Sequence, residues 1–286
     1  MKVGQTSAKK TAAEKTIAEK IFTEQRAAEA DLPERISAKK TDAGKALEGM
    51  TSTEKASGGR KCFIVGAGEF DGFLAGADPG TENLLIAADG GYRHLQSLGR
   101  KPDVLLGDFD SLEVVPEHEH LIRHSPIKDD TDMALAVAYA QKEGYRTFFL
   151  YGGLGGRLDH TLANIQLLTG MSKEGLEGYL IGEDSVITAV TDGKLSFPET
   201  ASGMVSVFCM GASATGVYER GLKYSLEDAI LTCDRALGVS NEFTGEKSSI
   251  AVRSGTLLIM WDAKNGLPSA VSLSDTRMQT SIEDSE

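Results

Sequence analysis

The chain has 286 residues, of which 41% are hydrophobic and 25% are charged, and this is enough to bury one large core or two modest ones. The formal net charge of −12 argues against nucleic acid as a partner, because an acidic surface repels a polyanion. No apolar run approaches the roughly 18 residues of a membrane-spanning helix, so we expect no membrane partner. The three cysteines form no CxxC pair, and their odd number favours a reducing, cytoplasmic compartment.

Residues 1–58 differ in composition from the rest of the chain. They hold 11 Lys and Arg, 9 Asp and Glu, and a single aromatic residue, Phe22. So few large apolar groups cannot offset the entropy of ordering the segment, which predicts a disordered N-terminal extension. Helix-forming composition over residues 11–30 indicates a transient helix. A docking or targeting role is the alternative.

From Lys61 the pattern changes to short apolar runs that end in Gly or Asp. These runs cover residues 61–65, 84–88, 104–106 and 147–151. Continuous apolar runs of this length are typical of strands buried on both faces. Helical spacing of apolar residues over 133–140 and 158–168 separates the later runs. The pattern predicts a parallel-sheet α/β domain over residues 59–172.

After about residue 172 the helical patterns stop. Short β-rich runs with turn residues between them cover 178–182, 185–190, 204–210, 228–233, 249–253 and 256–261. This spacing predicts an antiparallel β-sandwich domain over residues 173–267. Residues 268–286 are polar, and we expect a frayed tail there.

Acidic residues follow the predicted strands of the α/β domain, where ligands bind in parallel sheets. Asp89 follows the second strand, Asp108 and Asp110 follow the third, and Asp132 stands at the start of a helix. Carboxylates that converge on one cleft repel one another, and a divalent cation such as Mg²⁺ removes that repulsion. Turn and helix capping is the alternative for any one of these acids. The repetition at several strand ends favours a metal site with Asp108 and Asp110 in it.

A glycine-rich loop, residues 152–156, joins the fourth strand to a helix that Arg157 precedes. Glycines let backbone N–H groups approach an anion, and a helix N-terminus adds free donors. Arg157 supplies a guanidinium that matches phosphate oxygens. The alternative is an ordinary tight turn. Lys128 is equally suited to contact phosphates or to pair with a neighbouring acid.

Five segments in order carry a resemblance to a known family. They are 89–91 (DGG), 102–111 (PDVLLGDFDS), 128–132 (KDDTD), 152–160 (GGLGGRLDH) and 238–243 (GVSNEF). This ordered set resembles the thiamine pyrophosphokinase family from about Lys61 to Trp261. The resemblance implies an α/β domain followed by a β-sandwich, in a homodimer. The active site would lie between the α/β domain of one subunit and the β domain of the other.

The resemblance also implies roles for particular residues. Asp108, Asp110 and Asp132 match the family's magnesium-binding acids, and with Arg157 they form the expected catalytic set. We expect ATP contacts from Asp89, Gly90, Lys128, Asp129, Gly153, Gly156, Arg157 and Asp159. Tyr224 matches the aromatic that stacks on thiamine, a Trp in animal members. Ser240 and Asn241 match the motif near the vitamin.

The expected activity is that of a thiamine diphosphokinase. The thiamine hydroxyl attacks the β-phosphorus of ATP and AMP leaves, with Mg²⁺ at the phosphates and Arg157 or Lys128 supporting the developing charge. An acidic site with an aromatic face suits the thiazolium cation. The alternatives are a pyrophosphokinase for another hydroxymethyl compound such as a pterin, and a thiamine or nucleotide sensor without catalysis.

Overall fold

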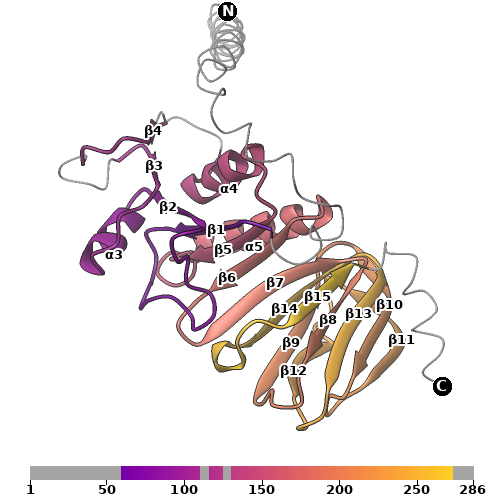
Figure 1. Cartoon of the computed structure of the whole chain (residues 1–286). Coiled ribbons are helices and arrows are strands. Elements are labelled where there is room, and N and C mark those ends of the chain that lie inside the picture. Colours follow the sequence, from indigo (N-terminus) through magenta and orange to yellow (C-terminus); the bar gives the residue numbers. More distant parts are fainter. Residues whose placement is uncertain (1–58, 110–115, 125–129, 273–286) are drawn as a thin grey trace, which may run out of the picture. The chain divides into compact units, whose positions relative to one another are not determined.

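The structure is a computed structural model that describes residues 59–109, 116–124 and 130–272 (Figure 1). Four residues singled out in the sequence, Asp110, Ser111, Lys128 and Asp129, lie outside these ranges, as do the N-terminal extension and residues 273–286. Within the described part, no helix is long and apolar enough to cross a membrane.

One half of the main sheet is parallel. Its strands are β1 (Lys61–Val65), β2 (Leu84–Ala88), β3 (Val104–Gly107), β4 (Leu121–Arg123), β5 (Thr147–Tyr151) and β6 (Glu177–Ile181). They lie in the order β6-β5-β1-β2-β3-β4, and every neighbouring pair is parallel. The four apolar runs predicted as buried strands are confirmed.

Three helices cover the parallel strands (Figure 1). They are α3 (Gly91–Ser97), α4 (Asp132–Lys142) and α5 (Leu158–Lys173). Side chains alternate across a strand, so Phe63 packs on the face that contains Leu95 of α3. Ile64 packs on the opposite face with residues of α4 and α5, such as Val137 and Leu168. The sheet therefore buries apolar side chains on both faces.

The strands that follow β6 in the described part of the chain pair antiparallel. They are β7 (Ser185–Thr191), β8 (Gly193–Phe197), β9 (Met204–Cys209), β10 (Ser213–Arg220), β11 (Leu226–Thr232), β12 (Gly238–Glu242), β13 (Ser248–Ser254), β14 (Thr256–Asp262) and β15 (Ser269–Ser272). Strands β7, β14, β9 and β12 extend the main sheet beyond β6, and the others form a five-stranded sheet in the order β11-β10-β13-β8-β15. A short 3₁₀ turn, Ala263–Asn265, follows β14.

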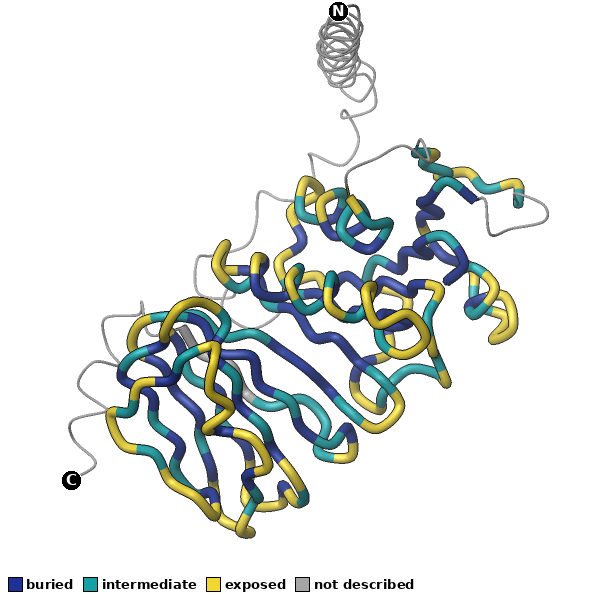
Figure 2. The backbone as a smooth tube through the Cα atoms, turned by 180° about the vertical axis from the view of Figure 1, so that it is seen from behind, coloured by how far each residue is buried: buried dark blue, intermediate teal, exposed yellow. Residues whose placement is uncertain are grey.

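The two sheets pack face to face around one apolar core. Val207 and Ile259 of the main sheet and Val217 and Ile250 of the five-stranded sheet belong to the same cluster, and each is fully buried. The first four residues of β14 are all buried, whereas buried positions alternate with more exposed ones along β8 and β9; Figure 2 colours the buried positions dark blue. This is the expected pattern of a sandwich, with one face inward and one outward, and the predicted fold class is confirmed.

Two details of the prediction are wrong. The run at 178–182 was expected in the antiparallel part, but β6 pairs parallel with β5, because the α5 crossover returns the chain in the same direction. The frayed tail was expected from residue 268, but β15 pairs with β8. A strand pattern alone indicates neither the direction of a strand nor its partner.

Candidate active site

The ends of β2 and β3 bring two of the predicted acids to adjacent loops. Asp89 follows β2, and its backbone N–H donates a 2.7 Å hydrogen bond to the carbonyl of Leu106 in β3. Gly107 lies so close that an added Cβ atom would be 3.0 Å from the Cα atom of Asp89. Asp108 comes next in the chain. The structure therefore places Asp89 and Asp108 at the same carboxyl edge of the sheet, as the strand ends predicted.

Both acidic loops have strained backbones. Asp89 has a φ of 45° and Phe109 has a φ of 62°, and neither is a glycine. For a bulky residue this region is a genuine outlier and costs about 1–3 kcal/mol. The side chain of Phe109 is 2% exposed within the core, and this packing offsets the strain. The buried ring thus anchors the backbone directly after Asp108.

One carboxylate oxygen at this edge is buried without a partner. Asp89 Oδ1 has no hydrogen bond within the described part of the chain, and an unsatisfied buried oxygen of this kind is costly. Such an oxygen beside Asp108 fits the demand of Mg²⁺ for oxygen ligands. Among the described residues, no three His, Cys, Asp or Glu side chains are grouped for a metal. Asp110, one of the three predicted ligands, lies outside them.

Asp132 is the first residue of α4, which follows β4 and so begins at the carboxyl edge of the sheet. Thr131 caps this helix, because its Oγ1 accepts a 3.2 Å hydrogen bond from the backbone N–H of Ala134. An acid in the first helical turn also interacts favourably with the helix dipole. Asp132 therefore combines the expected position near the acidic edge with a local role in starting the helix.

The glycine-rich loop after β5 is held against the loop after β1. Gly68 donates a 2.8 Å hydrogen bond from its backbone N–H to the carbonyl of Gly152. The carbonyl of Gly153 accepts a 2.8 Å bond from the buried Asn164 side chain. Gly155 and Gly156 have φ of 75° and 58°, which side chains rarely adopt. The backbone of the loop is therefore already shaped before any ligand binds. The Glu69 carboxylate lies directly against Gly155, and its negative charge disfavours an anion at that point of the loop.

Arg157 and Asp159 form a two-point ion pair at the start of α5. Arg157 Nη2 lies 2.7 Å from Asp159 Oδ2, and Arg157 Nε donates to Oδ1 at 3.2 Å. The hydrogen bonds from Arg157 lower the pKa of Asp159 to about 2. Both side chains are exposed. Arg157 therefore already shares its charge with an acid.

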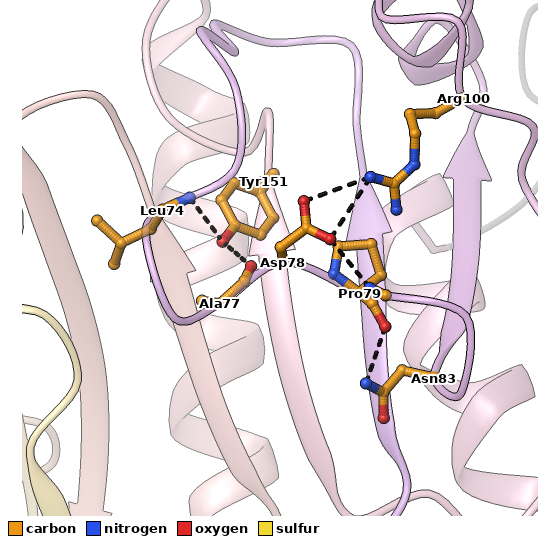
Figure 3. A network of polar contacts seen from close by, with 8 residues as sticks. Leu74, Ala77, Asp78, Pro79, Asn83, Arg100 and Tyr151 are labelled. Carbon is orange, nitrogen blue, oxygen red and sulfur yellow. Dashed lines mark hydrogen bonds and ion pairs between the residues drawn. The ribbon is translucent and has the colours of Figure 1, made fainter.

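A cavity of about 240 Å³ lies at the ends of β1, β5 and β6, and no sequence motif had indicated it. Phe70, Phe73 and Tyr151 line it together with the acids Glu69 and Glu183. Figure 3 shows how Tyr151 holds its wall: the hydroxyl donates a 2.7 Å bond to the carbonyl of Ala77 and accepts one from the Leu74 N–H. The two phenylalanines after the first strand were the available signal, but their place beside Tyr151 depends on the tertiary fold.

Two further contacts hold a later part of the same loop, outside the lining of the cavity. Arg100 forms an ion pair of 3.3 Å with Asp78, and the side chain of Asn83 donates a 2.8 Å bond to the carbonyl of Pro79 (Figure 3). Among these contacts, the Tyr151 hydroxyl ties the loop between β1 and β2 to the sheet, and the Arg100 and Asn83 contacts hold its later part.

In the β-sandwich, Tyr224 and Ser240 are exposed. Tyr224 is 61% exposed, with the Lys223 ammonium 5.6 Å from its ring centre. Ser240 has a φ of 62°, and its backbone N–H donates to Ser206 Oγ at 3.1 Å. Both residues are therefore accessible at the surface of this part of the chain.

Asn241 differs from its neighbours because it is 3% exposed. Its Oδ1 accepts from the backbone N–H groups of Tyr224 and Glu242, at 3.0 and 2.9 Å. Its Nδ2 donates to the Tyr224 carbonyl and to Glu219 Oε2, both at 2.7 Å. An amide has two acceptor sites and two donor hydrogens, and all are in use. The structure thus places Asn241 beneath Tyr224, with no hydrogen-bonding capacity left for a ligand.

The acidic edge and the Tyr224 surface lie far apart within one chain. Strand β12, which carries Ser240 and Asn241, and strand β2, which leads into Asp89, are seven steps apart in the main sheet. At about 4.8 Å per step this separates them by roughly 30 Å. A small substrate cannot bridge that distance.

The fold and the two groups of residues define a two-part protein, with an acidic α/β edge and a separate aromatic surface on a β-sandwich. The family described as "Thiamin pyrophosphokinase, catalytic domain" matches residues 80–180. The family described as "Thiamin pyrophosphokinase, vitamin B1 binding domain" matches residues 194–257. Together they match more than half of the chain, and each group falls in one of them.

Similar proteins and solved structures point to the same family as the two domain matches. The chain is 27% identical over 185 residues to the thiamine pyrophosphokinase of Bacillus subtilis (62% of this chain, 86% of that one). It is 25% identical over 187 residues to thiamin pyrophosphokinase 1 of Caenorhabditis elegans (61% and 76%). The crystal structure of the Bacillus subtilis protein superposes with a TM-score of 0.61 at 25% identity, covering 70% of this chain and 98% of that one. The chain belongs to the thiamin pyrophosphokinase family.

Proposed function

We propose that this protein is a thiamine diphosphokinase, which transfers the diphosphate of ATP to the hydroxyl of thiamine and releases AMP. One observation carries the proposal. The acidic carboxyl edge with Asp89 and Asp108 lies in the part that matches the catalytic domain, and the exposed Tyr224 surface lies in the part that matches the vitamin-binding domain. A nucleotide-side edge and a vitamin-side surface are what a transfer between these two substrates needs.

The acidic edge fits Mg²⁺. Asp108, Asp110 and Asp132 would hold the ion, and Mg²⁺ bound there would neutralise the charge of the ATP phosphates. The preshaped loop with Gly153 and Gly156 suits contacts between backbone N–H groups and phosphate. Asp89, Gly90, Lys128 and Asp129 complete the proposed nucleotide side. Phosphoryl-type transfer depends mainly on positioning and electrostatics, which this set of acids and backbone donors would supply.

Arg157 is the proposed support for charge that develops on the phosphates. In the free protein its partner Asp159 keeps the guanidinium oriented at the start of α5. If the Asp159 carboxylate moved away or shared the guanidinium with a ligand, the same N–H donors of Arg157 would bind phosphate oxygens. On the vitamin side, Tyr224 would offer an aromatic face to the thiazolium cation, and Ser240 precedes Asn241, which bonds the Tyr224 backbone.

We propose that the active site is completed in a homodimer. The separation of roughly 30 Å between β2 and β12 supports a site made from the acidic edge of one subunit and the Tyr224 surface of the other. We also propose a cytoplasmic location, which the unpaired Cys62, Cys209 and Cys233 support.

The test is release of AMP from ATP and Mg²⁺ in the presence of thiamine. Asp108→Asn removes one charge from the proposed metal site and should lower kcat by on the order of 10²- to 10³-fold. Glu143→Gln is the matched control, because Glu143 is exposed at the opposite end of α4, and it should retain normal turnover. Formation of ADP, or thiamine binding without AMP release by the unmodified protein, would contradict the proposal.

A further inference from the structure

Glu219 is a buried acid that no motif had indicated. It lies on β10 of the five-stranded sheet and is 1% exposed. Its Oε2 accepts the 2.7 Å hydrogen bond from Asn241, and its Oε1 has no hydrogen bond within the described ranges. Acids are almost never fully buried unless they are paired, so a fully buried Glu with an uncharged partner needs an explanation.

The contacts of Glu219 join the two sheets of the sandwich. Asn241 belongs to β12 of the main sheet, so the hydrogen bond between Glu219 and Asn241 crosses the core. Gly238, at the start of β12, also faces the carboxylate: an added Cβ atom there would lie 3.0 Å from Glu219 Oε1 and 2.8 Å from the Val207 carbonyl. Two residues of the segment 238–243 therefore accommodate Glu219. Asn241 bonds its carboxylate, and Gly238 leaves room for it because it has no side chain.

Through Asn241 the contact reaches the exposed surface. A carboxylate oxygen accepts hydrogen bonds from the NH₂ group of Asn241 and repels its oxygen, so Glu219 favours the amide orientation that the three backbone contacts of Asn241 also require. In that orientation Asn241 bonds both the N–H and the carbonyl of Tyr224 and the N–H of Glu242. The backbone at Tyr224 is thus tied to a buried carboxyl through a single side chain.

We propose that Glu219 is a positioning residue for the thiamine side of the site, acting on Tyr224 through the amide of Asn241. The inference rests on the proposed function, because it assigns thiamine to the Tyr224 surface. A protonated carboxyl also keeps one oxygen that accepts from Asn241, so the contact does not require a charge. Glutamine offers the same acceptor at the same length, whereas aspartate is one methylene too short and leucine has no acceptor.

The experiment compares Glu219→Gln, Glu219→Asp and Glu219→Leu in the full chain, with KM measured separately for thiamine and for ATP. We expect Glu219→Gln to keep both KM values within about twofold. We expect Glu219→Asp and Glu219→Leu to raise KM for thiamine by about tenfold, because displaced contact groups lose binding, with KM for ATP changed less than about twofold. Glu227→Gln is the control, since Glu227 on the neighbouring β11 is exposed and paired with Arg220.

A second readout does not depend on turnover. The Tyr224 N–H is protected by Asn241, so its hydrogen exchange should speed up by about tenfold or more in Glu219→Asp and stay unchanged in Glu219→Gln. This measurement also decides the question if Glu219→Leu fails to fold. Unchanged KM for thiamine and unchanged exchange in Glu219→Asp would overturn the inference, as would an equal rise in KM for both substrates. Failure of the unmodified protein to release AMP would instead overturn the proposed function.

Discussion

At the scale of single residues, the surroundings of a side chain decide its role. The sequence grouped Ser240 and Asn241 as neighbouring contacts for the vitamin. In the structure Ser240 is exposed, with a strained backbone at an irregular part of strand β12, whereas Asn241 is buried with its amide fully used. Residue type and spacing gave no signal for this difference, because it depends on Glu219, which lies 22 positions away in the sequence. Asp89 and Asp108 were predictable because both directly follow buried parallel strands.

The ionisation of Glu219 predicts a pH-dependent stability. Burial raises the pKa of Glu219 to about 7 from 4.5, and the hydrogen bond from Asn241 opposes part of the rise. Below pH 4.5 the carboxyl is protonated in both states. Between pH 4.5 and 7 the folded protein keeps a proton that the unfolded chain releases, so the free energy of unfolding falls as pH rises. The loss is about 1.4 kcal/mol per pH unit and at most about 3 kcal/mol in total.

Urea denaturation of the unmodified protein and of Glu219→Gln at pH 4.5, 6 and 8 measures how much the ionisation of Glu219 changes the free energy of unfolding. The stability advantage of the unmodified protein over the variant should shrink by up to about 3 kcal/mol from pH 4.5 to 8. Glu227→Gln should show a nearly constant difference, since its surface ion pair contributes little. A constant difference for Glu219→Gln as well would mean that Glu219 ionises normally.

At the scale of elements, apolar runs and helical spacing predicted the main strands and the two longer helices. The helix α3 has seven residues, no acid in its first turn and no side-chain cap, and the strand β4 has three residues, so neither had a detectable pattern. Strands β8, β10 and β12 were missed because turn residues and polar side chains interrupt them. Their pairing in the sandwich, and not their local sequence, makes them strands.

The loop between β1 and β2 depends on one hydroxyl group. Tyr151→Phe removes the bond to the Ala77 carbonyl and leaves a buried carbonyl without this partner, while the ring keeps its edge contacts with Phe70 and Phe73. We expect a loss of about 1–3 kcal/mol in the free energy of unfolding, measured by urea denaturation. Tyr218→Phe is the control, because its hydroxyl bonds the exposed Arg253, and it should change stability by less than about 0.5 kcal/mol. Equal effects of the two variants would contradict a structural role for the Tyr151 hydroxyl.

At the scale of the whole molecule, the main sheet links both halves of the proposed site, because Tyr224, which lies between β10 and β11, is hydrogen-bonded to Asn241 on β12 of that sheet. The parallel strands end at the acidic edge, and the antiparallel strands continue the same sheet to β12. The sequence predicted both architectures but not that they share a sheet, because hydrogen bonding between strands from different segments is a property of tertiary structure. That shared sheet is what sets the distance between the acids and the Tyr224 surface.

Complementation between variants tests whether two subunits share a site. A heterodimer of Asp108→Asn with Tyr224→Ala has one site that holds both changes and one site with neither. Random pairing of equal amounts gives heterodimers as half of all dimers, so co-expression should restore about a quarter of normal AMP release. Asp108→Asn combined with Asp132→Asn is the matched control. Both changes lie in the acidic half, so every site in that heterodimer carries one of them and no activity should return. Restoration in neither mixture, with dimers present in solution, would mean that each chain completes its own site despite the roughly 30 Å that separate β2 from β12 across the sheet.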